Sequence, residues 1–177
     1  MEAKITRERL ITFLLVTPMF EKLDPAEVME IIHVVDVEQY KAGDTVFREG
    51  DPGDAWYVLY KGAVDVLKQG ATGEKKIAGL GPEACFGEIS ILDGSPRSAT
   101  IRATEDSVVF RVARDAFNEL VASGHLVAYK LLHEMAILLA KRQRITTLRL
   151  SELLSATEIA DVHKELMDIV GESSVRE

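Results

Sequence analysis

Glycine is concentrated in the middle of this chain. Ten of the 12 glycines lie between Gly43 and Gly94, and none of the five prolines follows Pro96. Short runs rich in Val, Ile, Phe and Tyr alternate with these glycines at a spacing of roughly ten residues. This pattern is typical of short antiparallel strands joined by tight turns. The middle of the chain therefore predicts an antiparallel β-sandwich or jelly roll, and the flanks predict helices.

The N-terminal flank, residues 1–34, predicts two helices. An apolar run over 7–16 has helical character and stops before Pro18. Asp24 and Pro25 then supply a second start signal, because Asp is a good N-cap residue and Pro suits the first helical turn. The helix that follows has an apolar face at the i, i+3, i+4 spacing, made by Val28, Ile31 and Ile32.

Helical periodicity returns after the β-prone segment. Asp115 is expected to cap a short helix that ends at Gly124. A longer helix is predicted over 126–147, and a last amphipathic piece over 155–170. The longer helix carries one apolar stripe, made by Leu131, Met135, Leu138 and Ile145, on which Arg142 also falls.

These signals divide the chain into an α+β arrangement of four parts. They are N-terminal helices over 1–34, a β-sandwich over 35–114, C-terminal helices over 115–170 and a frayed tail over 171–177.

Charge and cysteine content argue against several classes of protein. The 21 Lys and Arg residues against 29 Asp and Glu residues give a net charge of −8, which opposes a broad nucleic-acid surface. Cys85, the one cysteine, is expected to be a small buried hydrophobe. The apolar stretch 10–16 is far short of the roughly 20 residues that span a bilayer, and Glu2 and Glu8 do not suit a signal peptide. We therefore expect a cytoplasmic protein with no nucleic-acid or membrane partner.

Residues 84–100 combine three features suited to a sugar phosphate. Gly87 allows a ligand to approach the main chain closely. The next five residues, 88–92, predict one helical turn whose unpaired N–H groups attract an anion. Arg97 offers a planar cationic fork for two phosphate oxygens, and Glu88 offers an acceptor for a sugar hydroxyl.

This segment resembles the phosphate-binding cassette of the cyclic nucleotide-binding domain family, which includes catabolite activators and protein kinase A regulatory subunits. The family pattern F-G-E-x-x-x-L, a short spacer and P-R-x-A-T is matched by 86–88, Leu92 and 96–100. Residues 40–51 are similar to the family's first glycine loop, and 56–64 resemble its strand-turn-strand signature. The resemblance covers residues 18–145 and implies a stand-alone member without a DNA-binding domain.

The resemblance also implies a role for each matched residue. Arg97 would bind the exocyclic phosphate oxygens, and Glu88 would accept a hydrogen bond from the ribose 2′-OH. The backbone amides of Gly87 and Ala99, with the Ser98 hydroxyl, would complete the phosphate cradle. Ser98 stands where the family often carries Ala for cAMP or Thr for cGMP, and we favour cAMP. The pocket wall would be formed by Val66, Ile77, Ala78, Phe86 and Ile89.

The implied function is a regulatory sensor without metal or cofactor. Ligand binding would move the C-terminal helices, with Met135, Leu138 and Arg142 as candidate lid residues. The long helix would also form a homodimer seam, and an unidentified downstream protein would read its movement. For Arg142, a solvated surface position is the simpler alternative.

The sequence leaves five other interpretations to consider. Arg97 and Glu88 could form an ordinary surface ion pair worth about 0–1 kcal/mol. A cupin-type metal enzyme would need histidine ligands within 35–114, where the chain has none, and a Ser hydrolase would need a G-x-S-x-G elbow that is missing. A transcription factor would need a basic recognition helix after Thr147. A scaffold with a decayed pocket is disfavoured by the intact cassette.

Overall fold

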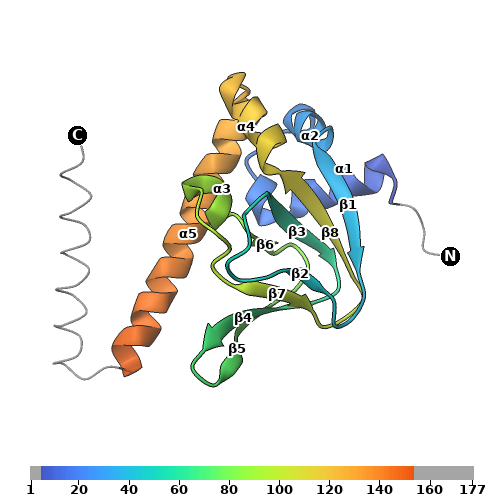
Figure 1. Ribbon diagram of the computed structural model, residues 1–177. Coiled ribbons are helices and arrows are strands. Elements are labelled where there is room, and N and C mark those ends of the chain that lie inside the picture. Colours follow the sequence, from blue (N-terminus) through green and yellow to red (C-terminus); the bar gives the residue numbers. More distant parts are fainter. Residues whose placement is uncertain (1–4, 154–177) are drawn as a thin grey trace, which may run out of the picture. The chain divides into compact units, whose positions relative to one another are not determined.

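The computed structural model describes residues 5–153, which form two compact units that meet between Met135 and Ala136. The first unit contains every strand of the described chain and most of its helices (Figure 1). The second unit is described over residues 136–153, which are helical.

The strands of the first unit form two four-stranded antiparallel sheets, in the orders β1-β8-β3-β6 and β2-β7-β4-β5. This confirms the predicted antiparallel sandwich with flanking helices. The strands are β1 (Val35–Tyr40), β2 (Thr45–Phe47), β3 (Ala55–Lys61), β4 (Val64–Gly70), β5 (Gly73–Leu80), β6 (Cys85–Phe86), β7 (Thr100–Ala103) and β8 (Ser107–Ala113).

Strand β3 lies between β8 and β6 and is covered on both faces. Trp56 is fully buried and stacks on Phe20, with ring centroids 6.0 Å apart. Its neighbour Tyr57 points to the other face and stacks on Phe86 at 5.2 Å. Because side chains alternate along a strand, β3 contributes to a helix-covered core on one face and to the sandwich interior on the other. Cys85 is buried, as predicted.

The N-terminal helices pack against the sheet that contains β3. Helix α1 (Arg7–Val16) places Phe13 edge-on to Phe110 of β8 at 5.5 Å. A short 3-10 turn, η1 (Pro18–Phe20), leads to α2 (Pro25–Ile32). Asp24 caps α2 and forms a capping box with Glu27, which confirms the predicted start at Asp24-Pro25.

The C-terminal helices differ from the prediction at two boundaries. Helix α4 (Arg114–Ala122) has Ala113 at its N-cap position, so Asp115 lies inside the first turn and does not cap it. Helix α5 (Leu126–Leu153) continues past Thr147, because no Gly or Pro interrupts it there. The predicted stop at Gly124 is confirmed by its left-handed conformation, with φ of +73°. The predicted piece over 155–170 lies outside the described residues.

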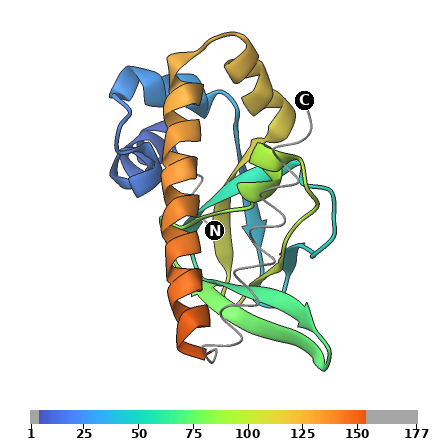
Figure 2. The ribbon, with the colours of Figure 1, turned by 90° about the vertical axis from the view of Figure 1, so that its left-hand side faces the viewer.

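The β4–β5 hairpin extends from the end of the sandwich opposite to α2 and α4 (Figures 1 and 2). Its strand β5 pairs only with β4, and most of its side chains are exposed. This exposed hairpin contrasts with the segment that follows it in the chain, where both residues of β6 are buried and α3 (Ile89–Asp93) buries Ser90 and Ile91.

Candidate phosphate-binding site

The cassette begins with a glycine that no other residue could replace without strain. Gly87 has φ of +78°, and a Cβ atom there would lie 2.8 Å from Nη1 of Arg97 and 3.3 Å from the Ala55 carbonyl oxygen. Both the left-handed backbone and the close approach of Arg97 therefore require glycine. Helix α3 follows, with Glu88 at its N-cap position and Gly94 in the left-handed conformation after its last turn.

Arg97 is turned into the sandwich and is only 2% exposed. Its Nη1 donates to the Gly87 carbonyl oxygen at 3.0 Å, and its Nη2 donates to Oδ1 of Asp54 at 3.0 Å. The guanidinium also lies over the Phe47 ring, 4.1 Å from its centroid. Burial lowers the pKa of Arg97, while the carboxylate of Asp54 acts in the opposite direction. The third guanidinium nitrogen, Nε, is buried and has no acceptor among the described groups.

Asp54 is shared by two arginines, Arg97 from the loop before β7 and Arg111 from β8. Its Oδ2 accepts from Nη2 of Arg111 at 2.8 Å, while its Oδ1 accepts from Arg97. Burial would raise the pKa of Asp54, but the hydrogen bond and charge of Arg111 outweigh it and hold that pKa below its usual value. Arg111 in turn lies 3.6 Å from carboxylate oxygens of both Asp36 and Glu38 on β1. Asp54 therefore remains ionised and orients the Arg97 fork.

The structure excludes an ordinary surface ion pair between Arg97 and Glu88. Glu88 is 1% exposed, and Arg97 is nearly as deeply buried and pairs with Asp54. Two buried groups of opposite charge in one glycine-rich segment carry a large desolvation cost unless each is hydrogen-bonded. Their burial therefore marks the cassette as a specialised site.

The main chain around Arg97 is held by the loop that follows β2. The Arg97 amide donates to the Asp51 carbonyl oxygen at 2.8 Å, and the Arg97 carbonyl accepts from the Gly50 amide at 2.9 Å. Ser98 is exposed and Ala99 is buried. The predicted phosphate contacts thus lie on a segment whose backbone is anchored from outside the cassette.

The predicted wall residues fall into two groups. Phe86 is buried, and Val66 is partly buried against the same cluster. In contrast, Ile77 is 56% exposed and Ile89 is 36% exposed, and Ala78 is exposed next to Ile77. The structure therefore brings Phe86 and Val66 together and leaves the other three at the surface. Ile77 and Ala78 are exposed because β5 has no second neighbouring strand, and Ile89 is exposed as the first residue of α3.

The predicted lid residues belong to different units. Met135 is fully buried and ends the first unit. Leu138 and Arg142 lie on the part of α5 that belongs to the second unit.

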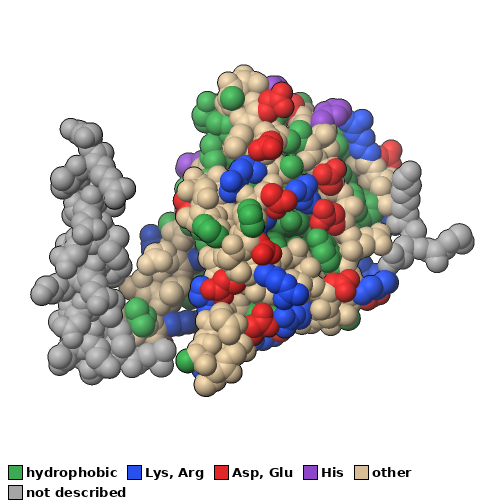
Figure 3. Space-filling model, in the orientation of Figure 1, with side chains coloured by type: hydrophobic (Ala, Val, Ile, Leu, Met, Phe, Trp, Pro, Cys, Tyr) green, Lys and Arg blue, Asp and Glu red, His purple; other side chains and the backbone are tan. Residues whose placement is uncertain are grey.

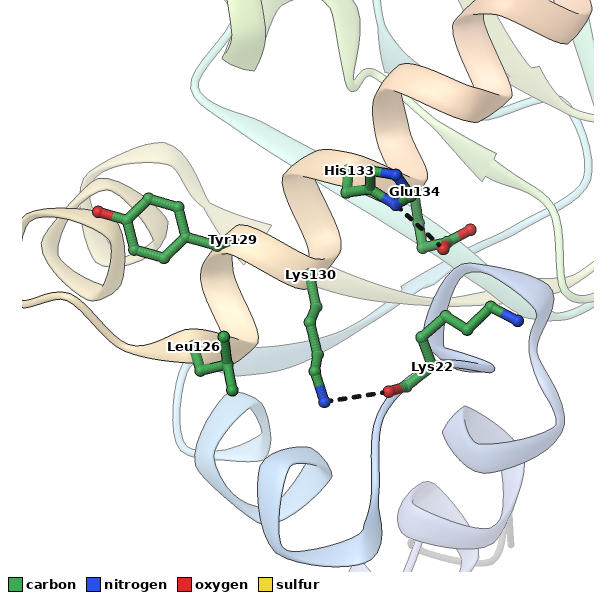
Figure 4. Close-up of a pocket in the computed structure, with 6 residues that line it drawn as sticks. All are labelled: Lys22, Leu126, Tyr129, Lys130, His133 and Glu134. Carbon is green, nitrogen blue, oxygen red and sulfur yellow. Dashed lines mark hydrogen bonds and ion pairs between the residues drawn. The ribbon is translucent and has the colours of Figure 1, made fainter.

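A separate hollow of about 310 Å³ lies beside the start of α5 (Figure 4). The ammonium group of Lys130 donates there to the Lys22 carbonyl oxygen at 3.3 Å and to Glu27 at 2.7 Å. The other lining residues are Leu126, Tyr129, His133 and Glu134. None of them belongs to the cassette, so this hollow is distinct from the phosphate-binding site.

Residues 5–153 contain no group of three or more His, Cys, Asp and Glu side chains that could hold a metal ion. Within the same range, no helix has both the length and the apolar character needed to cross a membrane. On the face drawn in Figure 3, Lys and Arg side chains are interspersed with Asp and Glu side chains.

Sequence reasoning missed three residues that support Arg97. Asp54 precedes it by 43 residues, Arg111 is linked to it through Asp54, and Phe47 lies on β2. The only available signal was an aspartate placed directly before the buried strand β3, which indicates a carboxylate near the interior.

Comparison with known proteins identifies the same segment. A family model described as "Cyclic nucleotide-binding domain" matches residues 37–124. The cAMP-dependent protein kinase regulatory subunit of Aspergillus niger is 38% identical over 122 residues, which are 68% of this chain and 29% of that protein. The cyclic AMP receptor protein of Thermus thermophilus is 36% identical over 143 residues, which are 80% of this chain and 64% of that protein. The chain thus spans less than two thirds of the length of either relative.

Solved structures agree with this assignment. The crystal structure of a cyclic nucleotide-binding domain from Methylobacillus flagellatus superposes with a TM-score of 0.74 at 27% identity, and the match covers 84% of each chain. The fold, the cassette and these similarities together lead to one conclusion: this chain belongs to the cyclic nucleotide-binding domain family.

Proposed function

We propose that this chain is a non-catalytic sensor that binds cAMP in preference to cGMP through residues 84–100. The observation that carries the proposal is the state of Arg97, which is 2% exposed and retains a buried Nε donor without an acceptor among the described groups. A buried cation with an unmatched donor favours an incoming anion such as phosphate. Movement of the guanidinium from Asp54 toward the ligand would satisfy that donor.

The rest of the cassette would recognise the ribose and complete the cradle. Glu88 is the proposed acceptor for the ribose 2′-OH, because a buried carboxylate gains more from a hydrogen bond than an exposed one does. The amides of Gly87 and Ala99 and the hydroxyl of Ser98 are the proposed phosphate donors. The exposed wall residues Ile77, Ala78 and Ile89 would lose exposure when base and ribose pack against them, together with Val66 and Phe86.

The names of similar proteins support cAMP as the ligand. The kinase regulatory subunit and the receptor protein to which the chain is similar both carry cAMP in their names. Ser98 offers a hydroxyl that could serve the phosphate. The same hydroxyl could serve a guanine amino group, and cGMP is therefore the alternative ligand.

The sensor would act by shifting a population between two arrangements of the C-terminal helices. Arg114, the first residue of α4, donates a hydrogen bond to the Ser90 carbonyl oxygen within α3. This contact connects the cassette helix to α4, so ordering of the cassette and inward movement of Leu92 would repack the helices that follow. The extent of the shift is limited by the difference in ligand affinity between the two states. Met135, Leu138 and Arg142 are the proposed lid.

The long helix α5 is also the proposed seam of a homodimer. Ile145, Leu148 and Leu150 are 51%, 63% and 41% exposed, although all three are large and apolar. Light scattering at micromolar concentration should then give twice the monomer mass, and a monomer would contradict the seam. A downstream cytoplasmic protein is the proposed reader of the helix movement.

Calorimetric titration with cAMP and with cGMP, followed by analysis of the nucleotide recovered, tests the proposal. We expect saturable binding of both, tighter binding of cAMP and recovery of the intact ligand. Release of a linear nucleotide would identify an enzyme. No heat with either compound would favour the alternative, a scaffold or regulatory subunit with a degenerate pocket.

A further inference from the structure

Lys68 on β4 connects the loop after β2 to the end of the cassette. Its ammonium group lies 2.7 Å from Oε1 of Glu49 and donates to the Ser98 carbonyl oxygen at 2.9 Å. The other oxygen of Glu49 accepts from the Gln69 amide at 2.9 Å. The Glu49 amide donates to the Thr100 hydroxyl at 2.9 Å. Glu49 and Lys68, which are distant from each other in sequence, therefore both contact the segment that contains Ser98 and Thr100.

The contact with the Ser98 carbonyl also determines the direction of the next amide. In a trans peptide the C=O of one residue and the N–H of the following residue point to opposite sides of the chain, and the described chain has no cis peptide bond. Lys68 lies on the exposed side, with 49% of its side chain accessible. The Ala99 N–H is thereby directed away from that exposed side and toward the interior, where Ala99 itself is buried.

A second contact fixes the preceding peptide in a similar way. The Arg97 carbonyl accepts from the Gly50 amide, which directs the Ser98 N–H to the opposite side. The Gly50 contact uses only main-chain atoms, whereas the contact to the Ser98 carbonyl uses a side chain. The orientation of the Ser98–Ala99 peptide therefore depends on which side chain stands at position 68, whereas the Gly50 contact to the Arg97–Ser98 peptide needs no side chain.

The charge of Lys68 is balanced locally. The Gln69 amide and the Lys68 ammonium lower the pKa of Glu49, so this carboxylate is ionised at neutral pH. An ion pair exerts little net field at a distance in water. Lys68 is therefore suited to hold the cassette in position more than to attract phosphate by its charge.

We propose that Lys68, held by Glu49, is a positioning residue that fixes the Ser98–Ala99 peptide so that the Ala99 amide faces the phosphate of the ligand. The inference rests on the proposed binding of a cyclic nucleotide and assigns part of that affinity to a residue outside the cassette. Its partner Glu49 orients Lys68 without contacting the ligand.

Calorimetry with cAMP on matched variants tests this proposal. Lys68→Met should raise Kd by about three- to tenfold, as expected for the loss of one hydrogen bond that orders the site. Lys76→Met is the control, because Lys76 forms a 2.6 Å ion pair with Asp65 on the same hairpin, and its Kd should remain within about twofold of the original value. Lys68→Arg keeps a cationic donor and should restore most of the affinity.

The double variant Lys68→Met/Glu49→Gln tests whether Lys68 acts by positioning the peptide or by balancing the charge of Glu49. It removes both members of the pair, so the unbalanced carboxylate that Lys68→Met leaves behind is no longer present. We expect the raised Kd to persist. A Kd that returns to the original value would show that the carboxylate had repelled the ligand, and would overturn the positioning role. Equal Kd values for Lys68→Met and Lys76→Met would overturn it as well.

A measurement without ligand distinguishes failure of this inference from failure of the proposed function. The backbone amide resonance of Ala99 should shift in Lys68→Met and stay in place in Lys76→Met. If the unaltered protein binds no cyclic nucleotide, the proposed function fails, and a shifted Ala99 resonance still supports the orienting contact. An unshifted resonance in Lys68→Met overturns the contact, whether or not the protein binds nucleotide.

Discussion

Arg97 of the cassette and Lys76 of the β4–β5 hairpin each form a close ion pair with an aspartate, but the two cations differ in burial. Nη2 of Arg97 and Oδ1 of Asp54 lie 3.0 Å apart; the Arg97 side chain is 1% exposed, and that of Asp54 is 63% exposed. Lys76 and Asp65 lie closer, at 2.6 Å, but the Lys76 side chain is 57% exposed. Water screens the exposed pair and competes for its partners, whereas a buried arginine depends on the groups around it. The burial of the cation therefore decides how strongly each residue depends on its ion pair, and the distance between the charged atoms does not.

The largest effect is expected for Arg97→Ala. Loss of one partner of a buried charged contact costs about 2–5 kcal/mol, so Kd for cAMP should rise by more than tenfold in calorimetry. Arg102→Ala is the exposed control, because Arg102 pairs with Glu74 at 2.8 Å with 35% of its side chain accessible. Arg97→Lys keeps the charge without the fork and should be intermediate. An unchanged Kd in Arg97→Ala would remove this residue from the phosphate role.

Glu88→Gln should weaken cAMP binding by about tenfold, because a charge-assisted hydrogen bond becomes a neutral one. A 2′-deoxy analogue lacks the hydroxyl that Glu88 is proposed to hold, so its Kd should barely change. Both ligands can be titrated into both proteins by calorimetry. Equal losses for the two ligands would refute the ribose assignment.

Gly53→Ala should destabilise the fold by about 1–3 kcal/mol through overpacking. A Cβ atom at Gly53 would lie 2.1 Å from the Ser90 Cβ atom of the cassette helix. Gly81→Ala, just after β5, is the matched control, because nothing lies within 4 Å of its Cβ position. Urea unfolding measures the stability of both variants. Equal unfolding midpoints would show that α3 shifts to accommodate the added methyl group without a loss of stability.

Asp54→Asn should give the smallest effect, one that depends on pH. The pKa of Asp54 is lowered in the folded protein: burial opposes the lowering, and Arg111 and Arg97 outweigh it. A lowered carboxyl pKa stabilises the fold above the unfolded value of about 3.9, and this stability is lost as the pH falls through the folded value. The difference in Tm from the unaltered protein should therefore be present at pH 7 and shrink below about pH 4. A difference that stays constant with pH would assign the effect to packing.

Much of the fold could be predicted from local patterns. The glycine turns between Gly43 and Gly94 and the alternating strands indicated the sandwich, and Asp24-Pro25 indicated the start of α2. The errors were also local. Asp115 is a good cap residue by type, but β8 leads directly into α4 with Ala113 at the N-cap, so Asp115 lies two positions past the cap.

The candidate site was predicted only in part. Gly87, Glu88 and Arg97 lie within one continuous segment, so their residue types and spacing could be interpreted together. Asp54 is 43 residues from Arg97 in sequence, and Lys68 is 30 residues from Ser98. No local pattern links such pairs, because only the pairing of strands brings them together.

The amino-acid sequence alone determined the class of fold and the residue types available to bind a phosphate, since both follow from short-range periodicity and from chemistry within a single segment. The tertiary structure decided that Arg97 is buried, that Asp54 divides its carboxylate between two arginines, and that Lys68 reaches the Ser98 carbonyl. The physical reason is that burial and long-range contacts depend on how the two sheets and their loops pack. This packing determines how far each charged group is removed from water, and therefore how much its contacts contribute to the free energy.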